Sequence, residues 1–304
     1  MTFDLDFDLN HVKFVEFGVG RDDDTGQTFA AVPVDASVQM ALSEMVLATL
    51  AEMKRNANVP DKYEPSDKHS SLEYLYLPRD DDLATSVWNL HQAENLSIDT
   101  AALTRLDDLF CYFARLTDTK QRKLTAMRRA GQFKGIVKNK GRLVRLLDDT
   151  LKIIEDTIFK LDNEFDLLVD SKHVHILRPS GFEFTGKLQQ AILDAVPANV
   201  AVIKRELTFI EFGGIEQYAA KHPRAARYLA SIRGQEEMKN IDKSALKKLC
   251  KNTGVNISES KGKVTIAEGD EMAFLQVLDR RRYQLELIKD KPEKFVAASR
   301  KAIN

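Results

Sequence analysis

Pairs of short apolar segments, each pair joined by a brief polar turn, recur along this chain of 304 residues and restrict its fold most strongly. The pairs are HVKFVEFGVG with TFAAVPVD around RDDDTGQ, FDLLVD with HVHILRP around SK, and VNIS with KVTIAEG. Connections this short join antiparallel neighbours, because a parallel pair needs a crossover of a dozen or more residues. The sequence therefore predicts β-hairpins in three places.

Helical segments separate these hairpins. Asp35 is placed to cap a helix that follows it, and Asp242 to cap another that Gly254 ends. Pro223 suits the first turn of a further helix, because the missing N–H of proline costs nothing there. Helices and hairpins are interspersed without a regular βαβ order, so the predicted class is α+β.

The length favours two domains. We expect a small α+β domain at 1–104, followed by a larger mixed α+β domain at 105–304 with hairpins and a helical C-terminal part. The distant Cys111 and Cys250 exclude a disulfide framework and fit a reducing cytoplasm. The N-terminus lacks a signal-peptide pattern, and no apolar run approaches the ~18 residues of a membrane span. We therefore expect a cytoplasmic protein without direct membrane insertion.

Segment 120–147, KQRKLTAMRRAGQFKGIVKNKGRLVRLL, has ten Lys or Arg and no Asp or Glu, whereas the whole chain has 45 basic and 46 acidic residues. Its glycines predict a loop-rich segment rather than one long helix. Cationic side chains on such a segment can follow a phosphate backbone without reading bases. The candidate DNA-binding residues here are Arg122, Lys123, Arg128, Arg129, Lys134, Lys138, Lys140, Arg142 and Arg145.

A second basic set lies on the helix that Asp242 caps. Lys243, Lys247 and Lys251 are spaced to share one helical face and extend the candidate DNA-binding set, and residues 280–282 form a third basic cluster. The alternative is that the basic stretch pairs with acidic residues of the same chain or of another subunit. The N-terminal half supplies Asp4, Asp6, Asp8, Asp22, Asp23, Asp24, Asp80, Asp81 and Asp82.

Signatures of nucleotide hydrolases, dehydrogenases and zinc peptidases are missing. His173 and His175 share one strand face, where two imidazoles can hold a metal, but the sequence supplies no convincing third ligand, so ordinary hairpin side chains are favoured. Asp170 and Lys172 have the spacing of Mg²⁺-dependent nucleases, with Asp156, Asp162 and Asp166 upstream, but an ordinary turn is favoured. We expect no catalytic residue, no metal and no cofactor.

The order FDLLVDSKHVHILRPSGFE, a mostly helical middle, LKKLCKNTGVNI with KVTI, and a closing strand plus helix in LDRRRYQLELIKDKPEKFVAASRKAI resembles the KwaB-like proteins of the Kiwa anti-phage defence system. The resemblance covers roughly residues 105–304. It implies a bacterial cytoplasmic protein that binds phage DNA and is recruited to the inner membrane by a transmembrane partner of the KwaA type, and it supplies no catalytic residues.

These observations together predict a non-enzymatic, homodimeric DNA-binding defence protein that works with a membrane-embedded partner. Two alternatives stay open. One is a Mg²⁺-dependent DNA nuclease of the defence type, and the other is a protein-interaction module without a nucleic-acid role.

Overall fold

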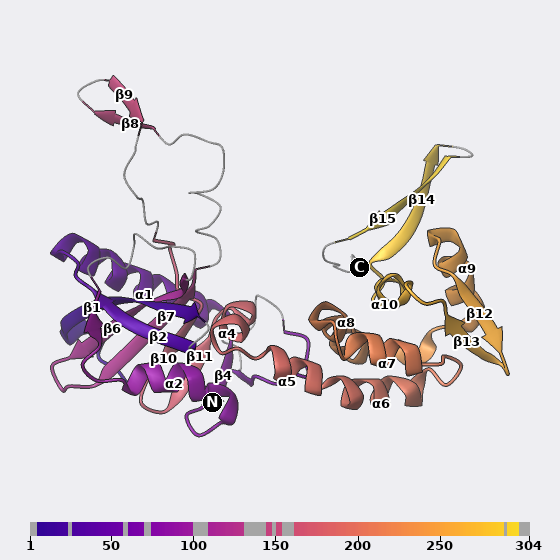
Figure 1. Ribbon diagram of the computed structural model, residues 1–304, viewed down its shortest axis with the longest axis horizontal. Helices are drawn as coiled ribbons and strands as arrows, with labels where there is room; N and C mark the ends of the chain where they lie inside the picture. The colour runs from indigo at the N-terminus through magenta and orange to yellow at the C-terminus, as the bar shows by residue number, and fades with distance from the viewer. Residues whose placement is uncertain are drawn as a thin grey trace. The chain divides into compact units, whose positions relative to one another are not determined.

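The computed structural model describes residues 5–23, 26–56, 60–69, 74–99, 109–130, 144–147, 150–153, 161–288 and 291–297. They belong to two compact units (Figure 1). Unit 1 comprises residues up to Tyr63 and His69–Lys187, and unit 2 comprises Glu64–Lys68 and the chain from Leu188. The boundary that we expected at 104/105 lies within unit 1, because strands from both sides of it share one sheet.

The described part of unit 1 is built on a nine-stranded sheet in the order β3-β4-β11-β10-β7-β6-β1-β2-β5. Neighbours are antiparallel except for the outermost pairs, β2 with β5 and β3 with β4. The predicted hairpins at 11–35 and 165–179 are confirmed as β1–β2 and β10–β11. The strands are β1 (Val12–Asp23), β2 (Gly26–Val32), β3 (Asp61–Lys62), β4 (Leu75–Pro78), β5 (Ser97–Ile98), β6 (Leu109–Asp118), β7 (Lys123–Arg129), β10 (Leu167–Val169) and β11 (His173–Ile176).

Helices cover both faces of the central strands. α1 (Ala36–Asn56) begins as predicted at Asp35, whose carboxylate accepts the Val38 N–H at 3.0 Å, and it packs on β1. α2 (Thr85–Gln92) and α4 (Pro179–Thr185) pack on β7. Leu124 and Ala126 of β7 join the core beneath α1, whereas Thr125 hydrogen-bonds His91 of α2. Since successive strand residues face opposite sides, α1 lies on one face and α2 on the other. Two short 3-10 helices, Leu9–His11 and Asp82–Ala84, complete the described helices of this unit.

The prediction that the basic stretch is loop-rich is wrong for its first third. Residues 123–129 form β7, which lies between β6 and β10 in the middle of the sheet. Leu124, Thr125, Ala126 and Met127 are all buried. The burial of these four uncharged residues places the segment in the sheet, although basic residues flank it on both sides. Residues 131–143 lie outside the described part of the chain, and beyond them β8 (Val144–Leu147) and β9 (Thr150–Ile153) form an antiparallel pair.

Unit 2 is mostly helical, with two hairpins (Figure 1). Asp242 accepts the Ala245 N–H at 2.7 Å and Gly254 ends α9 with φ 74°, as predicted. The chain thus combines a mixed sheet in unit 1 with helices and hairpins in unit 2, which confirms the predicted α+β class. The elements are α5 (Gln189–Asp194), α6 (Val196–Glu206), α7 (Gly213–Ala219), α8 (Pro223–Arg233), a 3-10 turn (Met238–Asn240), α9 (Lys243–Thr253), β12 (Ile257–Ser260), β13 (Lys263–Ile266), α10 (Glu271–Leu278), β14 (Arg282–Ile288) and β15 (Lys291–Val296).

The helix expected after the last predicted strand is wrong for residues 291–296. They form β15, which pairs antiparallel with β14. Tyr283 lies opposite Phe295, and the two rings stack with centroids 5.8 Å apart. Such a cross-strand aromatic pair stabilises a hairpin, and Pro292 disfavours a helix interior at this place.

Gly18 of β1 permits the close packing of the sheet at its centre. A Cβ atom at this position would lie 2.2 Å from the Phe113 ring. We expect Gly18→Ala to lower the free energy of unfolding by about 1–3 kcal/mol, because the overpacked ring must shift. Urea denaturation measures the change. Gly214→Ala in α7 is the control, since nothing lies within 4 Å of a Cβ there, and it should be neutral or slightly stabilising. Equal losses in both variants would contradict the packing argument.

Candidate nucleic-acid interface

Arg122, just before β7, is engaged by carboxylates of its own unit. Its Nε donates to Asp118 at 2.8 Å, and its Nη1 donates to Asp6 at 3.2 Å. These contacts raise the pKa of Arg122, the hydrogen bond to Asp118 most of all. Lys123 lies 3.8 Å from Glu94, a longer contact than those of Arg122. Pairing between the basic stretch and the acidic N-terminal segment therefore occurs at Arg122.

Arg128, at the end of β7, is a structural cation. Its Nε donates to Asp162 at 3.0 Å and its Nη1 to Asp166 at 2.7 Å. Asp166 is buried, and burial raises its pKa, while the neighbouring Arg128 guanidinium acts in the opposite direction. A buried carboxylate needs such a partner because isolated charge is costly away from water. Arg128 thus neutralises carboxylates within unit 1, and a contact of Arg128 with DNA stays a prediction.

Arg129 points to the opposite face of the sheet and is exposed. Its guanidinium lies 3.9 Å from the centroid of the Phe184 ring in α4, which is a cation–π contact. Its backbone N–H donates to Asp166 at 2.8 Å. Adjacent arginines therefore have different roles, since the pleat sends Arg128 into the protein and Arg129 outward.

The remaining members of the basic stretch stay predictions. Arg145 lies in β8, in register with Lys152 of β9. The other four, namely Lys134, Lys138, Lys140 and Arg142, lie outside the described residues.

In unit 2, α9 brings its predicted lysines to one surface. Lys243 and Lys247 both donate to Glu259 of β12, at 2.5 and 2.6 Å. The hydrogen bonds from Lys243 and then Lys247 lower the pKa of Glu259 to about 2. One carboxylate is therefore shared between two lysines, which leaves this surface positive.

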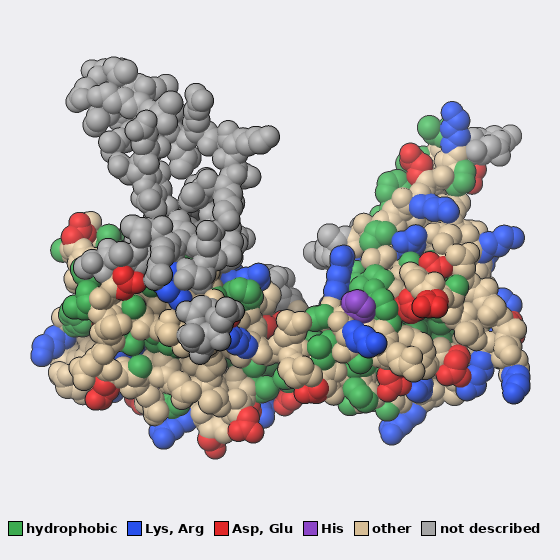
Figure 2. Space-filling model, in the orientation of Figure 1, with side chains coloured by type: hydrophobic (Ala, Val, Ile, Leu, Met, Phe, Trp, Pro, Cys, Tyr) green, Lys and Arg blue, Asp and Glu red, His purple; other side chains and the backbone are tan. Residues whose placement is uncertain are grey.

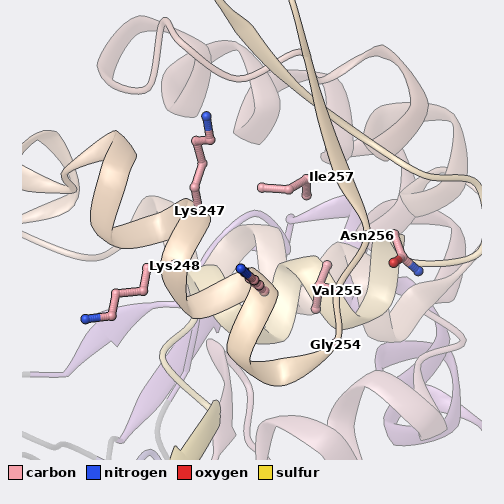
Figure 3. Close-up of a pocket in the computed structure, with 7 residues that line it drawn as sticks. Lys247, Lys248, Gly254, Val255, Asn256 and Ile257 are labelled. Atoms are coloured by element: carbon pink, nitrogen blue, oxygen red, sulfur yellow. The ribbon is translucent and has the colours of Figure 1, made fainter.

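A pocket of about 540 Å³ lies beside these lysines, at the C-terminal end of α9 (Figure 3). Lys247 and Lys248 extend from the helix in different directions, and Ile257 points from the start of β12 toward the helix (Figure 3). Lys248 and Lys251 are exposed, and neither has a carboxylate partner among the described residues. The lining residues are Lys247, Lys248, Lys251, Gly254, Val255, Asn256 and Ile257.

Two further cations from the β14–β15 hairpin lie at the same end of α9. Arg282 donates to the carbonyl of Thr253 through Nε at 3.3 Å and Nη2 at 3.1 Å. The Lys294 ammonium lies where a side chain on Gly254 would stand, 2.9 Å from the position of a Cβ. The partial negative charge of a helix C-terminus favours cations here. Lys294 is absent from the candidates predicted from the sequence, because a helix was expected in place of β15.

The nuclease constellation is not assembled in the described residues. Asp170 Oδ1 accepts the N–H groups of Lys172 and His173, both at 2.8 Å, which is the turn that the sequence favoured. Its Oδ2 accepts the Asp6 N–H at 3.0 Å, and Lys172 Nζ lies 3.6 Å from an Asp6 oxygen. The upstream Asp162 and Asp166 are bound to Arg128, and Asp156 lies outside the described residues.

Comparison with known proteins identifies a family. The model of the family described as Kiwa protein KwaB-like matches residues 106–287, which is more than half of the chain. No curated protein and no solved structure matches the chain. In the part of the chain that the structure describes, no helix is both long and apolar enough to cross a bilayer.

The different roles of Arg128 and Arg129 can be tested by stability. We expect Arg128→Ala to lower the free energy of unfolding by about 3–5 kcal/mol, because it removes the nearest cation from the buried Asp166 and leaves it with the more distant Arg178 at 3.8 Å. Arg129→Ala, the matched control, should cost no more than about 1 kcal/mol, the size of an exposed cation–π contact. Guanidinium chloride denaturation followed by circular dichroism measures both. A mild effect of Arg128→Ala would return this residue to the set of cations available to a ligand.

Proposed function

The chain belongs to the KwaB-like family of Kiwa proteins and hence to anti-phage defence, and we propose that it acts there by binding DNA through sequence-tolerant phosphate contacts. The observation that carries this proposal is the pocket at the end of α9. Lys248 and Lys251 contribute ammonium groups without carboxylate partners among the described residues, and Lys294 adds a third from β15. We call Lys247, Lys248, Lys251 and Lys294 the lysine cluster.

The composition of the lysine cluster suits a phosphate backbone better than base edges. Lysine ammonium groups act as point charges toward phosphate, whereas bidentate reading of guanine or adenine is mostly the work of arginine, asparagine and glutamine. A volume of about 540 Å³ lies in the range of small-ligand sites and admits a phosphate with its sugar. Binding of this kind should be similar for all DNA sequences and weakened by salt.

In unit 1, Arg129 and the basic residues that follow it form a second part of the proposed interface. Arg122 and Arg128 neutralise Asp118 and Asp166 of the same unit. We therefore assign them a structural role beneath the proposed interface and no phosphate contact. Among the described residues, the carboxylate partner of Lys123 is Glu94 at 3.8 Å, a contact loose enough for a phosphate to replace. The proposed phosphate contacts in unit 1 therefore come from Lys123, Arg129, Lys134, Lys138, Lys140, Arg142 and Arg145.

The proposal includes a homodimer in the cytoplasm and recruitment to the inner membrane by a transmembrane partner of the KwaA type. The family membership supports a defence system with more than one component. Unit 2 also offers apolar surface for protein contacts on the β14–β15 hairpin, where Leu287 is 88% exposed and Ile288 63% (Figure 2). Exposed apolar patches of this kind mark interaction surfaces.

Replacing Lys248, Lys251 and Lys294 together by Ala should weaken DNA binding equally for unrelated sequences. The slope of log K against log salt should become shallower by about 0.9 for each phosphate that the variant no longer neutralises. Fluorescence anisotropy with two duplexes of different sequence, over a salt series, measures both quantities. The control replaces the exposed Lys13, Lys54 and Lys221, which removes equal charge elsewhere. Equal weakening in the control would show that net charge, not this cluster, sets the affinity.

A second variant tests unit 1 separately. Lys134, Lys138, Lys140 and Arg142 replaced by Ala should flatten the salt slope by up to about four phosphates, at roughly 0.9 each. Unchanged binding would confine the interface to unit 2. Unchanged binding in both variants would refute the proposed interface.

The two alternatives have distinct outcomes in simple assays. Supercoiled plasmid incubated with the protein and Mg²⁺ should stay intact, and nicking abolished by Asp170→Asn would establish the nuclease instead. DNA should be retarded in a gel at ~50 mM salt, where binding led by phosphates is strong. Absence of any retardation would leave the basic surfaces as contacts to another protein.

A further inference from the structure

Asp170, His173 and His175 form a compact cluster at the β10–β11 turn of unit 1. Each offers one ligand atom, and these atoms all lie within 4.8 Å of one another. Strand alternation places His173 and His175 on one face of β11, and the turn returns Asp170 beside them. The hairpin turn thus brings Asp170 to the histidine pair as a third ligand.

We propose that Asp170, His173 and His175 bind one divalent transition-metal ion, for which Zn²⁺ is the best match. Two imidazoles and a carboxylate form a ligand set that Zn²⁺ accepts readily, whereas Mg²⁺ prefers oxygen ligands alone. Three protein ligands leave a fourth position of a tetrahedral ion open. The three ligands belong to unit 1 and share no residue with the lysine cluster of unit 2, so the site goes beyond the DNA-binding role proposed above.

The three residues differ in burial, so the cluster is closed on the side of Asp170 and His175 and accessible on the side of His173. Asp170 has no exposed surface and His175 is 2% exposed, while His173 is only partly buried. An ion can therefore reach the cluster from the His173 side and be held against two fixed ligands. Within the described structure, the His173 ring packs against the rings of Tyr76 and His175, which hold it at the entrance of the cluster.

The existing hydrogen bonds suit the exchange of a proton for a metal ion. His175 Nε2 lies 3.0 Å from Asp170 Oδ2, and His175 Nδ1 lies 2.6 Å from the Tyr74 hydroxyl. When the ion enters, the proton that Nε2 shares with Asp170 leaves and Nδ1 takes up one from solvent, so the imidazole stays neutral. Nδ1 then donates to the Tyr74 hydroxyl, and Nε2 binds the ion beside Asp170.

The Asp170 carboxyl group is held in its ionised form by its hydrogen-bond partners. Burial alone would raise its pKa, but the hydrogen bond and charge of His175 and the N–H groups of Asp6 and Lys172 lower it overall. Those backbone donors hold both carboxylate oxygens in place. Such outer hydrogen bonds are a regular feature of metal sites.

A bound ion would connect three parts of unit 1. Asp6, which donates to Asp170, belongs to the segment before β1, while Tyr74 stands before β4. Metal binding would therefore fasten the N-terminal segment and β4 to the β10–β11 turn. Since an ion that binds the folded state stabilises it, the thermal midpoint of unfolding should rise on addition of Zn²⁺.

Zinc binding should be measured on the full chain after removal of any affinity tag and treatment with a chelator. We expect one Zn²⁺ per chain in competition with a chromophoric chelator. His173→Ala should weaken binding at least about tenfold, and Tyr74→Phe, which alters the support of His175, by about 10- to 100-fold. His222→Ala, an exposed histidine of unit 2, is the control and should bind as the wild type does.

A second readout separates specific ligation from loss of fold. Co²⁺ bound in place of Zn²⁺ should give visible absorption bands that His173→Ala removes, while the far-ultraviolet circular dichroism of this variant stays that of the wild type. The wild-type thermal midpoint should rise with Zn²⁺, and that of His173→Ala should not. Absence of stoichiometric binding, or equal binding by His173→Ala, would overturn the proposed site.

Discussion

The contact between Arg128 and Asp166 holds the centre of unit 1 together. The Asp166 carboxylate receives Arg128 Nη1 and the Arg129 N–H, and its backbone carbonyl receives the N–H groups of Leu177 and Arg178. One residue thus connects β7, the start of β10 and the entry to α4. A buried carboxylate can do this only because a cation stands beside it, since the cost of taking the charge out of water is otherwise prohibitive.

This requirement sorts the basic residues of the chain into two kinds. Those near buried or half-buried carboxylates, such as Arg122 and Arg128, neutralise the fold's own charge. Others, such as Arg129, Lys248 and Lys251, lie exposed on the surface without a carboxylate partner among the described residues. Local density of Lys and Arg in a sequence cannot distinguish the two kinds, because Asp6, Asp162 and Asp166 lie more than 30 residues away along the chain from the arginines that they bind.

The first hundred residues complete the fold of the segment that the family model matches. The match begins at residue 106, yet β6 forms the longest ladder of the sheet with β1, from Val12 opposite Asp118 to Arg21 opposite Leu109. Residues 5–23 also supply Asp6, whose N–H and carboxylate contact the β10–β11 turn and Arg122. The N-terminal segment is therefore a structural part of unit 1 and not a separate domain.

The sequence by itself determined the local elements: the hairpins at 11–35 and 165–179, the caps at Asp35 and Asp242, the end of α9 at Gly254 and the α+β class. These depend on neighbouring residues, through turn chemistry, capping and the side-chain period of two. Tertiary structure alone decided that residues 123–129 are a central strand, that Lys294 joins the lysines of α9, and that Tyr74 lies against His175, beside Asp170 and His173. Each of these depends on partners distant in the chain, whose approach is set by the burial of apolar faces rather than by any local pattern.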